Sequence, residues 1–122
     1  MAGMRLSGKF PVLCVIAFLA ATMTLAADRF VTGIADLPLM PGLQEIEDSA
    51  MVFSKPEGRI VEIMASGAVS RDAVSSFYER TLPQLGWRRV EAESWLREKE
   101  LLRFDMRESK EGMVIQFSLT PQ

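Results

Sequence analysis

One segment near the middle of the chain, residues 70–86, determines the helical part of any fold that this sequence can adopt. Its apolar residues recur at spacings of three and four, which places them on one face of an α-helix. These residues are Ala73, Val74, Phe77, Tyr78, Leu82 and Leu85. Ser70 is suited to cap the first turn with its hydroxyl. Pro83 should kink the helix or end it near Leu82, and Gly86 can take the left-handed conformation that follows a helix.

The segments on both sides of this helix have the pattern of β-strands. Upstream, residues 51–53 and 59–65 flank a turn at residues 55–58 that contains proline and glycine, which predicts a hairpin. Downstream, residues 87–91 and 95–98 read as short strands. Two longer segments alternate apolar and polar residues, with Leu102, Phe104 and Met106 in one and Met113, Ile115, Phe117 and Leu119 in the other. The order ββαββββ predicts an α+β domain, with an antiparallel sheet of about five to six strands packed on one helix.

Before the hairpin, residues 28–49 form a lead without a regular period. Prolines and glycines interrupt its apolar residues, which are Phe30, Val31, Ile34, Leu37, Leu39, Met40 and Leu43. We favour a lead that seals one edge of the core over one that forms an exposed partner-binding strip, because large apolar patches are uncommon on monomer surfaces. We expect Leu37, Leu39 and Leu43 to lie against the domain, with Phe30 and Val31 less tightly held.

The first 27 residues have the order of an export signal. Arg5 and Lys9 form a basic start, residues 10–25 are apolar and uncharged, and small residues follow at Ala26 and Ala27. The apolar run is shorter than the roughly 20 residues that a membrane-spanning helix needs. We therefore favour a cleaved signal over a retained membrane anchor.

Cleavage there would divide the chain into a signal peptide (1–27), the irregular lead (28–49) and a single α+β domain (50–122). The expected location is periplasmic or secreted, with no membrane insertion after removal of the signal. The whole chain has 14 basic and 16 acidic residues. This mildly acidic balance argues against nucleic acid as a partner, because nucleic-acid binding needs a basic surface.

The sequence offers little to build an active site. It contains no histidine, and its one cysteine, Cys14, lies in the predicted signal. Histidine-dependent, thiol and thiolate-zinc chemistry are therefore not expected. The carboxylates Glu62, Glu98, Glu100 and Asp105 could act as an acid and base pair, but each has basic neighbours, so ion pairing is favoured. We predict no catalytic residue, no metal ligand and no cofactor, and hence no enzyme.

The residues from Phe77 to Trp87, which read FYERTLPQLGW, resemble the "FY...LP..GW" segment of many small exported bacterial domains of unassigned function. The residues around Asp36 to Leu43 and Gly58 to Ile60 resemble one uncharacterised proteobacterial subgroup of these domains. The resemblance covers most of the chain after residue 27. It implies a fold of this type and carries no catalytic residues.

Two function classes stay open. The favoured one is a non-catalytic envelope protein that contacts another envelope protein through the sheet's open face, an edge strand or the lead. The alternative is a module that binds a small apolar ligand or a lipid, which would need a cavity of about 300 Å³ or more between helix and sheet. As partner contacts we single out Leu37, Leu39 and Met40 in the lead, and Trp95, which we expect to be exposed on its strand.

Overall fold

A computed structural model describes residues 29–122, so the predicted signal segment and its cleavage site lie outside the described residues. The elements are β1 (Gln44–Glu45), β2 (Met51–Lys55), β3 (Gly58–Gly67), α1 (Arg71–Thr81), the 3-10 helix η2 (Leu82–Leu85), β4 (Arg88–Glu91), β5 (Ser94–Arg97), β6 (Glu100–Ser109) and β7 (Gly112–Pro121). The α+β class is confirmed. No helix within residues 29–122 has the length and apolar character needed to cross a membrane.

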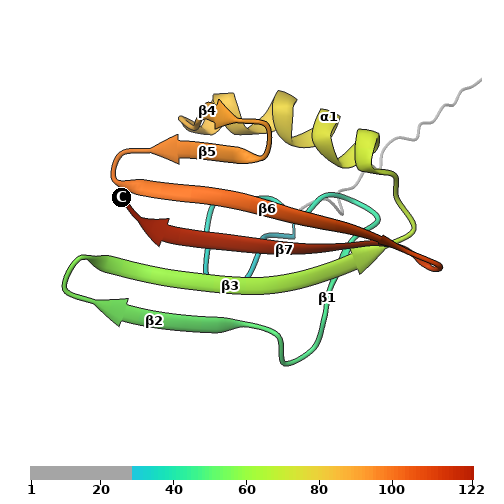
Figure 1. Cartoon of the computed structure of the whole chain (residues 1–122), viewed down its shortest axis with the longest axis horizontal. Helices are drawn as coiled ribbons and strands as arrows, with labels where there is room; N and C mark the ends of the chain where they lie inside the picture. The colour runs from blue at the N-terminus through green and yellow to red at the C-terminus, as the bar shows by residue number, and fades with distance from the viewer. Residues whose placement is uncertain (1–28) are drawn as a thin grey trace, which may run out of the picture.

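All strands in this part of the chain belong to one antiparallel sheet, in the order β1, β3, β7, β6, β5, β4, with β2 also paired to β3 (Figure 1). Strands β1 and β2 share one side of β3: β1 lies opposite residues 65–66, and β2 lies opposite residues 58–62. The structure thus has seven strands within residues 29–122, and the predicted count of five to six is wrong. The additional strand is β1, which has two residues and is too short to leave a periodic pattern.

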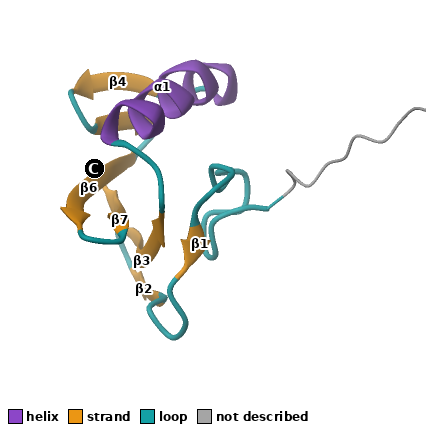
Figure 2. Ribbon diagram, turned by 90° about the vertical axis from the view of Figure 1, so that its right-hand side faces the viewer, coloured by secondary structure: helices purple, strands orange, loops and turns teal. Residues whose placement is uncertain are grey.

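Helix α1 and the lead cover the same face of the sheet. Figure 2 shows α1 at the end of the sheet that contains β4 and the lead at the end that contains β1. The strand residues that alternate toward this covered face are buried: Val61, Ile63, Ala65, Leu102, Phe104, Met106, Met113, Ile115, Phe117 and Leu119. Along the opposite face, which we call the open face, no helix or loop of residues 29–122 crosses the strands. The hydrophobic core is therefore one layer between the sheet and its cover.

The helix has the predicted signals at both ends. The Ser70 hydroxyl accepts a hydrogen bond from the backbone N–H of Ala73 at 3.0 Å. The α-helix ends at Thr81, and the chain continues through Pro83 as η2. Gly86 then has φ +93°, a conformation that glycine adopts without steric cost. The predicted end of the regular helix near Leu82 is confirmed.

The lead belongs to the core of this structure. Ile34, Leu37, Leu39 and Leu43 are buried together with residues of the sheet and the helix, which confirms the sealing interpretation. Phe30 is exposed, which agrees with the expectation that it is held less tightly, but the same expectation for Val31 is wrong because its side chain is fully buried. The backbone explains this difference, since the Val31 N–H donates to the Leu37 carbonyl oxygen at 2.8 Å and so folds the lead back on itself.

Two arginines attach the lead to the sheet. Arg97 on β5 bonds to the Asp36 carboxylate at 2.6 Å and 3.3 Å, and its guanidinium also stacks 4.3 Å from the centre of the Trp87 ring. Arg59 on β3 donates to the Gly33 carbonyl oxygen at 2.9 Å. The hydrogen bond from Arg97 is the main reason that the pKa of the Asp36 carboxyl is lowered.

Candidate functional site

The space between helix α1 and the sheet is filled by side chains. Tyr78 lies at its centre, with its ring 4.8 Å from that of Phe104 and 6.0 Å from that of Phe117. Beside Tyr78 the remaining void between α1 and β5 has a volume of about 10 Å³. Pockets that take up a drug-sized molecule have roughly 300 to 1,000 Å³. This void is far smaller than the cavity that the ligand-binding alternative requires.

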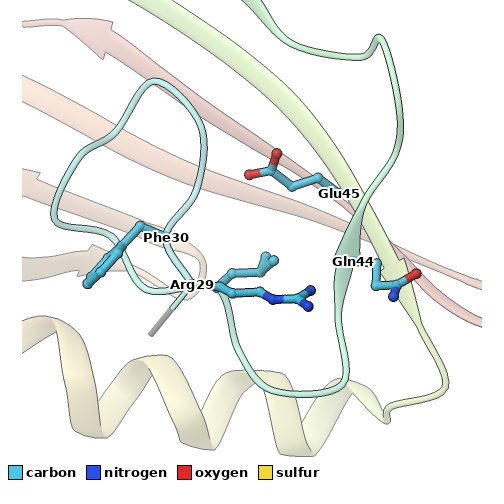
Figure 3. A pocket seen from close by; sticks show the side chains of 5 residues that line it. Arg29, Phe30, Gln44 and Glu45 are labelled. Carbon is cyan, nitrogen blue, oxygen red and sulfur yellow. The ribbon is translucent and has the colours of Figure 1, made fainter. Parts of the chain in front are cut away.

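Two larger hollows lie on the outside of the domain. One, of about 390 Å³, is lined by Arg29, Phe30, Leu39, Gln44 and Glu45 (Figure 3). In it the Glu45 carboxylate points toward the lead, where it accepts 2.7 Å hydrogen bonds from the N–H and the hydroxyl of Thr32. This carboxylate therefore holds the lead in place.

The second hollow, of about 410 Å³, lies where the β2–β3 turn and the β5–β6 turn meet. It is lined by Glu57, Gly58, Glu98, Lys99, Glu100 and Pro121. The Glu100 carboxylate forms an ion pair with Arg59, with 3.1 Å between Glu100 Oε2 and Arg59 Nε. Within residues 29–122 no group of three or more acidic, histidine or cysteine side chains is placed to hold a metal ion.

The residues singled out from the sequence as partner contacts lie in the core. Leu37 and Leu39 are buried, and Met40 is partly buried and packs against the same cluster. The backbone of this segment is bonded to the helix, because the Tyr78 hydroxyl contacts both Pro38 and Met40. We therefore assign no partner contact to these three side chains.

Trp95 is only 4% exposed, so the expectation of an exposed side chain is wrong. Its register partner on β6 is Leu102, a core residue, so Trp95 points to the covered face. Arg89 on β4 lies over its ring at 5.9 Å. Flanking charged residues suggested exposure in the sequence, but Trp95 lies on the side of the strand that α1 covers.

The most exposed apolar side chains of the sheet lie instead on strand β2. Met51, Val52 and Phe53 follow one another and are 48%, 55% and 51% exposed. Among the described residues β2 pairs only with β3, so every second residue of β2 presents its N–H and C=O to solvent. We call this strand, Met51–Lys55, the β2 edge. An exposed apolar edge of this kind can pair with a strand of another chain.

The side chains of the β2 edge extend to both faces of the sheet. Val52 lies opposite the core residue Val61 and so points to the covered face. Phe53 lies opposite Ile60, and Met51 opposite Glu62, so both point to the open face. The edge therefore offers apolar surface on both sides of its backbone.

On the open face, apolar side chains occur at the same end of the sheet on either side of β7. Ile60 follows Phe53 on the next strand. Thr120 of β7 then interrupts the row, and beyond it Leu101 lies opposite Leu96. Ile60, Leu96 and Leu101 are all partly exposed. We call Phe53, Ile60, Leu101 and Leu96 the apolar band. Toward the other end the open face becomes polar, with Gln116 opposite Asp105.

The opposite edge of the sheet, β4, is protected against such pairing. Three of its four residues are charged, namely Arg88, Arg89 and Glu91. Its register with β5 shifts between Arg89 and Glu91, and Arg89 pairs with Glu79 of α1 at 3.2 Å. Charged side chains, short length and irregular register are the devices by which proteins block edge pairing. Within residues 29–122 the β2 edge, with only Lys55 charged, is therefore the less protected of the two.

Comparisons with protein-family models, with curated proteins and with solved structures found no match to this chain. The candidate site is therefore assigned from the geometry of the β2 edge alone.

The residues of this edge were not predicted as contacts, although the sequence contains a signal for them. A strand with one covered face should alternate apolar and polar residues, whereas residues 51–53 are all apolar. A run of this kind on an edge strand indicates that apolar side chains on both of its faces can be buried by a partner.

Proposed function

We propose that this protein is an exported, non-catalytic envelope protein that acts through protein–protein contacts made by the β2 edge and the apolar band. The observation that supports the proposal is the run of three exposed apolar side chains, Met51, Val52 and Phe53, on a strand that pairs only with β3 among residues 29–122. Strand addition to such an edge supplies backbone hydrogen bonds, and neighbouring side chains supply specificity.

Three further features support a contact protein over a catalyst or a carrier. The void between α1 and β5 is about 10 Å³, which leaves no room for an apolar ligand there. The sequence has no histidine. The carboxylate of Glu100, one of the four considered for acid–base chemistry, is occupied by Arg59. Export to the periplasm or outside the cell, and kinship with the small exported bacterial domains that share the FY...LP..GW segment, belong to the same proposal.

A photo-crosslinking amino acid placed at a single position tests this function in intact cells. Benzoylphenylalanine in place of Phe53, in the full chain, should form covalent adducts with a contacting protein on irradiation. The matched control is the same substitution at Val90, which is 41% exposed on the protected edge β4. Adducts at position 53 and none at position 90 are the expected result. No adduct at position 53, or equal yields at both positions, would contradict the proposal.

A further inference from the structure

We infer that the partner of the β2 edge is a second copy of this chain, whose own β2 pairs with it in antiparallel orientation across a two-fold axis. The inference rests on the proposed function and names its partner. Two-fold dimers are the commonest oligomers of identical chains, and a two-fold axis perpendicular to the sheet pairs identical edge strands antiparallel. The two sheets would then join into one.

The charges at the two ends of β2 favour this partner. Glu47 and Asp48, which we call the acidic turn, precede the strand, and Lys55 ends it, and all three side chains are exposed. In an antiparallel pair of identical strands, Lys55 of each copy approaches the acidic turn of the other. A parallel pair would instead bring like charges together at both ends, so complementarity selects the two-fold arrangement.

The acidic turn is held beside the free edge. The Ser49 hydroxyl donates to the Ile46 carbonyl oxygen at 2.7 Å and accepts from the Met64 N–H at 3.1 Å. Asp48 has φ +64°, which turns the chain sharply between these bonds. In Figure 1 the connection between β1 and β2 projects beyond the edge (Figure 1). The turn is therefore positioned to flank a strand that pairs with β2.

The apolar residues fit the same arrangement. Phe53 and Met51 lie on the open face and Val52 on the covered face. When two β2 edges pair, each of these side chains lies beside its counterparts from the second copy, so both sides of the edge are covered at once. The apolar bands of the two open faces also become continuous across the joined sheet, which extends the contact beyond the backbone.

The oligomeric state of the protein purified from the cell envelope tests the inference. Because pairing of one short edge buries little area, we expect a weak dimer, visible by sedimentation velocity between about 1 µM and about 1 mM. Phe53→Lys places two cations near the two-fold axis and should weaken association by at least about tenfold. Val90→Lys, the same change on edge β4, should leave it unaltered. If the Phe53→Lys variant does not fold, Phe53→Ser replaces it in the same measurement and should also weaken association.

Charge exchange tests the orientation. Lys55→Glu alone and Glu47→Lys alone should each weaken the dimer by roughly three- to tenfold at low salt, because each occurs twice in the dimer. The double variant exchanges the signs of Glu47 and Lys55, and it should restore part of the association because Asp48 keeps its negative charge. The single-variant effects should also shrink as salt is added. A monomer at about 1 mM, association unaffected at Phe53, or no restoration in the double variant would overturn the inference.

The two proposals fail in different ways. If the purified protein is monomeric while the crosslinker at position 53 gives adducts whose mass is not that of a second copy, the contact function stands and the second copy is wrong. If no adduct forms at position 53, the contact function itself is wrong. Adducts at twice the mass of the chain, together with restoration by charge exchange, support both.

Discussion

The hydroxyl of Tyr78 donates a 2.8 Å hydrogen bond to the carbonyl oxygen of Pro38, which joins helix α1 to the lead 40 residues earlier in the chain. The same oxygen accepts a hydrogen bond from the backbone N–H of Met40 at 3.2 Å. Burial raises the pKa of this hydroxyl above its usual range, so it stays protonated and keeps its donor role. One side chain thus serves two backbone groups of a segment that has little regular structure of its own.

Tyr78→Phe should destabilise the domain by about 1 to 3 kcal/mol, because it leaves the Pro38 carbonyl and the Met40 N–H without their partner while keeping the ring. Urea unfolding measures this loss. Hydrogen exchange at the Met40 amide should also become faster in the variant. An unchanged urea midpoint together with unchanged exchange would show that the hydroxyl does not hold the lead.

Leu37→Ala should cost about 2 to 5 kcal/mol, since the Leu37 side chain is fully buried and its removal leaves a cavity. The matched control in the same lead is Phe30→Ala, because Phe30 is 52% exposed and should change the unfolding free energy much less. Deletion of residues 28–43 should lower the thermal midpoint and cause aggregation. Equal effects of the two point variants would mean that the lead does not belong to the core.

The ion pair between Asp36 and Arg97 should make stability depend on pH in the acid range. The folded-state pKa of Asp36 is lowered from 3.8, so the pair contributes fully above about pH 4 and its contribution is lost as the pH falls through the folded pKa. Because the carboxylate is half-exposed, we expect at most about 1 kcal/mol. Asp36→Asn should therefore lower the free energy of unfolding at pH 7 and much less at pH 2.5. A loss of the same size at both pH values would contradict this origin.

Trp87 provides a matched pair of variants that separates packing from hydrogen bonding. Its side chain is buried, and its Nε1 has no hydrogen-bond partner among the described residues. Trp87→Ala should cost about 3 to 5 kcal/mol through the lost packing. Trp87→Phe keeps an aromatic ring against Arg97 and loses no hydrogen bond, so its cost should be clearly smaller. Equal urea midpoints for the two variants would contradict this, because they would show that the aromatic ring retained in Trp87→Phe recovers none of the lost stability.

Export predicts the mass of the protein that cells accumulate. If residues 1–27 are a cleaved signal, the protein recovered from the envelope should begin at Ala27 or Asp28 and contain no thiol, because Cys14 is removed. Intact-mass spectrometry and thiol titration measure both properties. Recovery of the full 122-residue mass would support the membrane-anchor alternative instead.

Local patterns were enough to predict the elements that the chain specifies over short distances. The Ser70 cap, Pro83 and Gly86 act within a few residues of one another, so the start and end of the helix could be predicted. The long alternation in β6 and β7 likewise identified their buried residues, because side chains of a strand point to opposite faces in turn.

Features that depend on distant segments could not be predicted in this way. Strand β1 exists because Gln44 and Glu45 meet β3 at residues 65–66, and two residues carry no period. Trp95 is buried because its strand presents it to the face that α1 covers, whereas its charged neighbours along the chain suggested exposure. Both outcomes follow from which segments meet in space.

The sequence by itself therefore determined the helix, the alternation of the strands and the α+β class, because these arise from interactions between near neighbours. Only the tertiary structure decided which apolar residues are covered. The lead folds over the sheet and buries Leu37, whereas among residues 29–122 β2 pairs with β3 alone and leaves Phe53 exposed. The physical reason is that burial depends on the partner that a face meets, and that partner can lie anywhere along the chain.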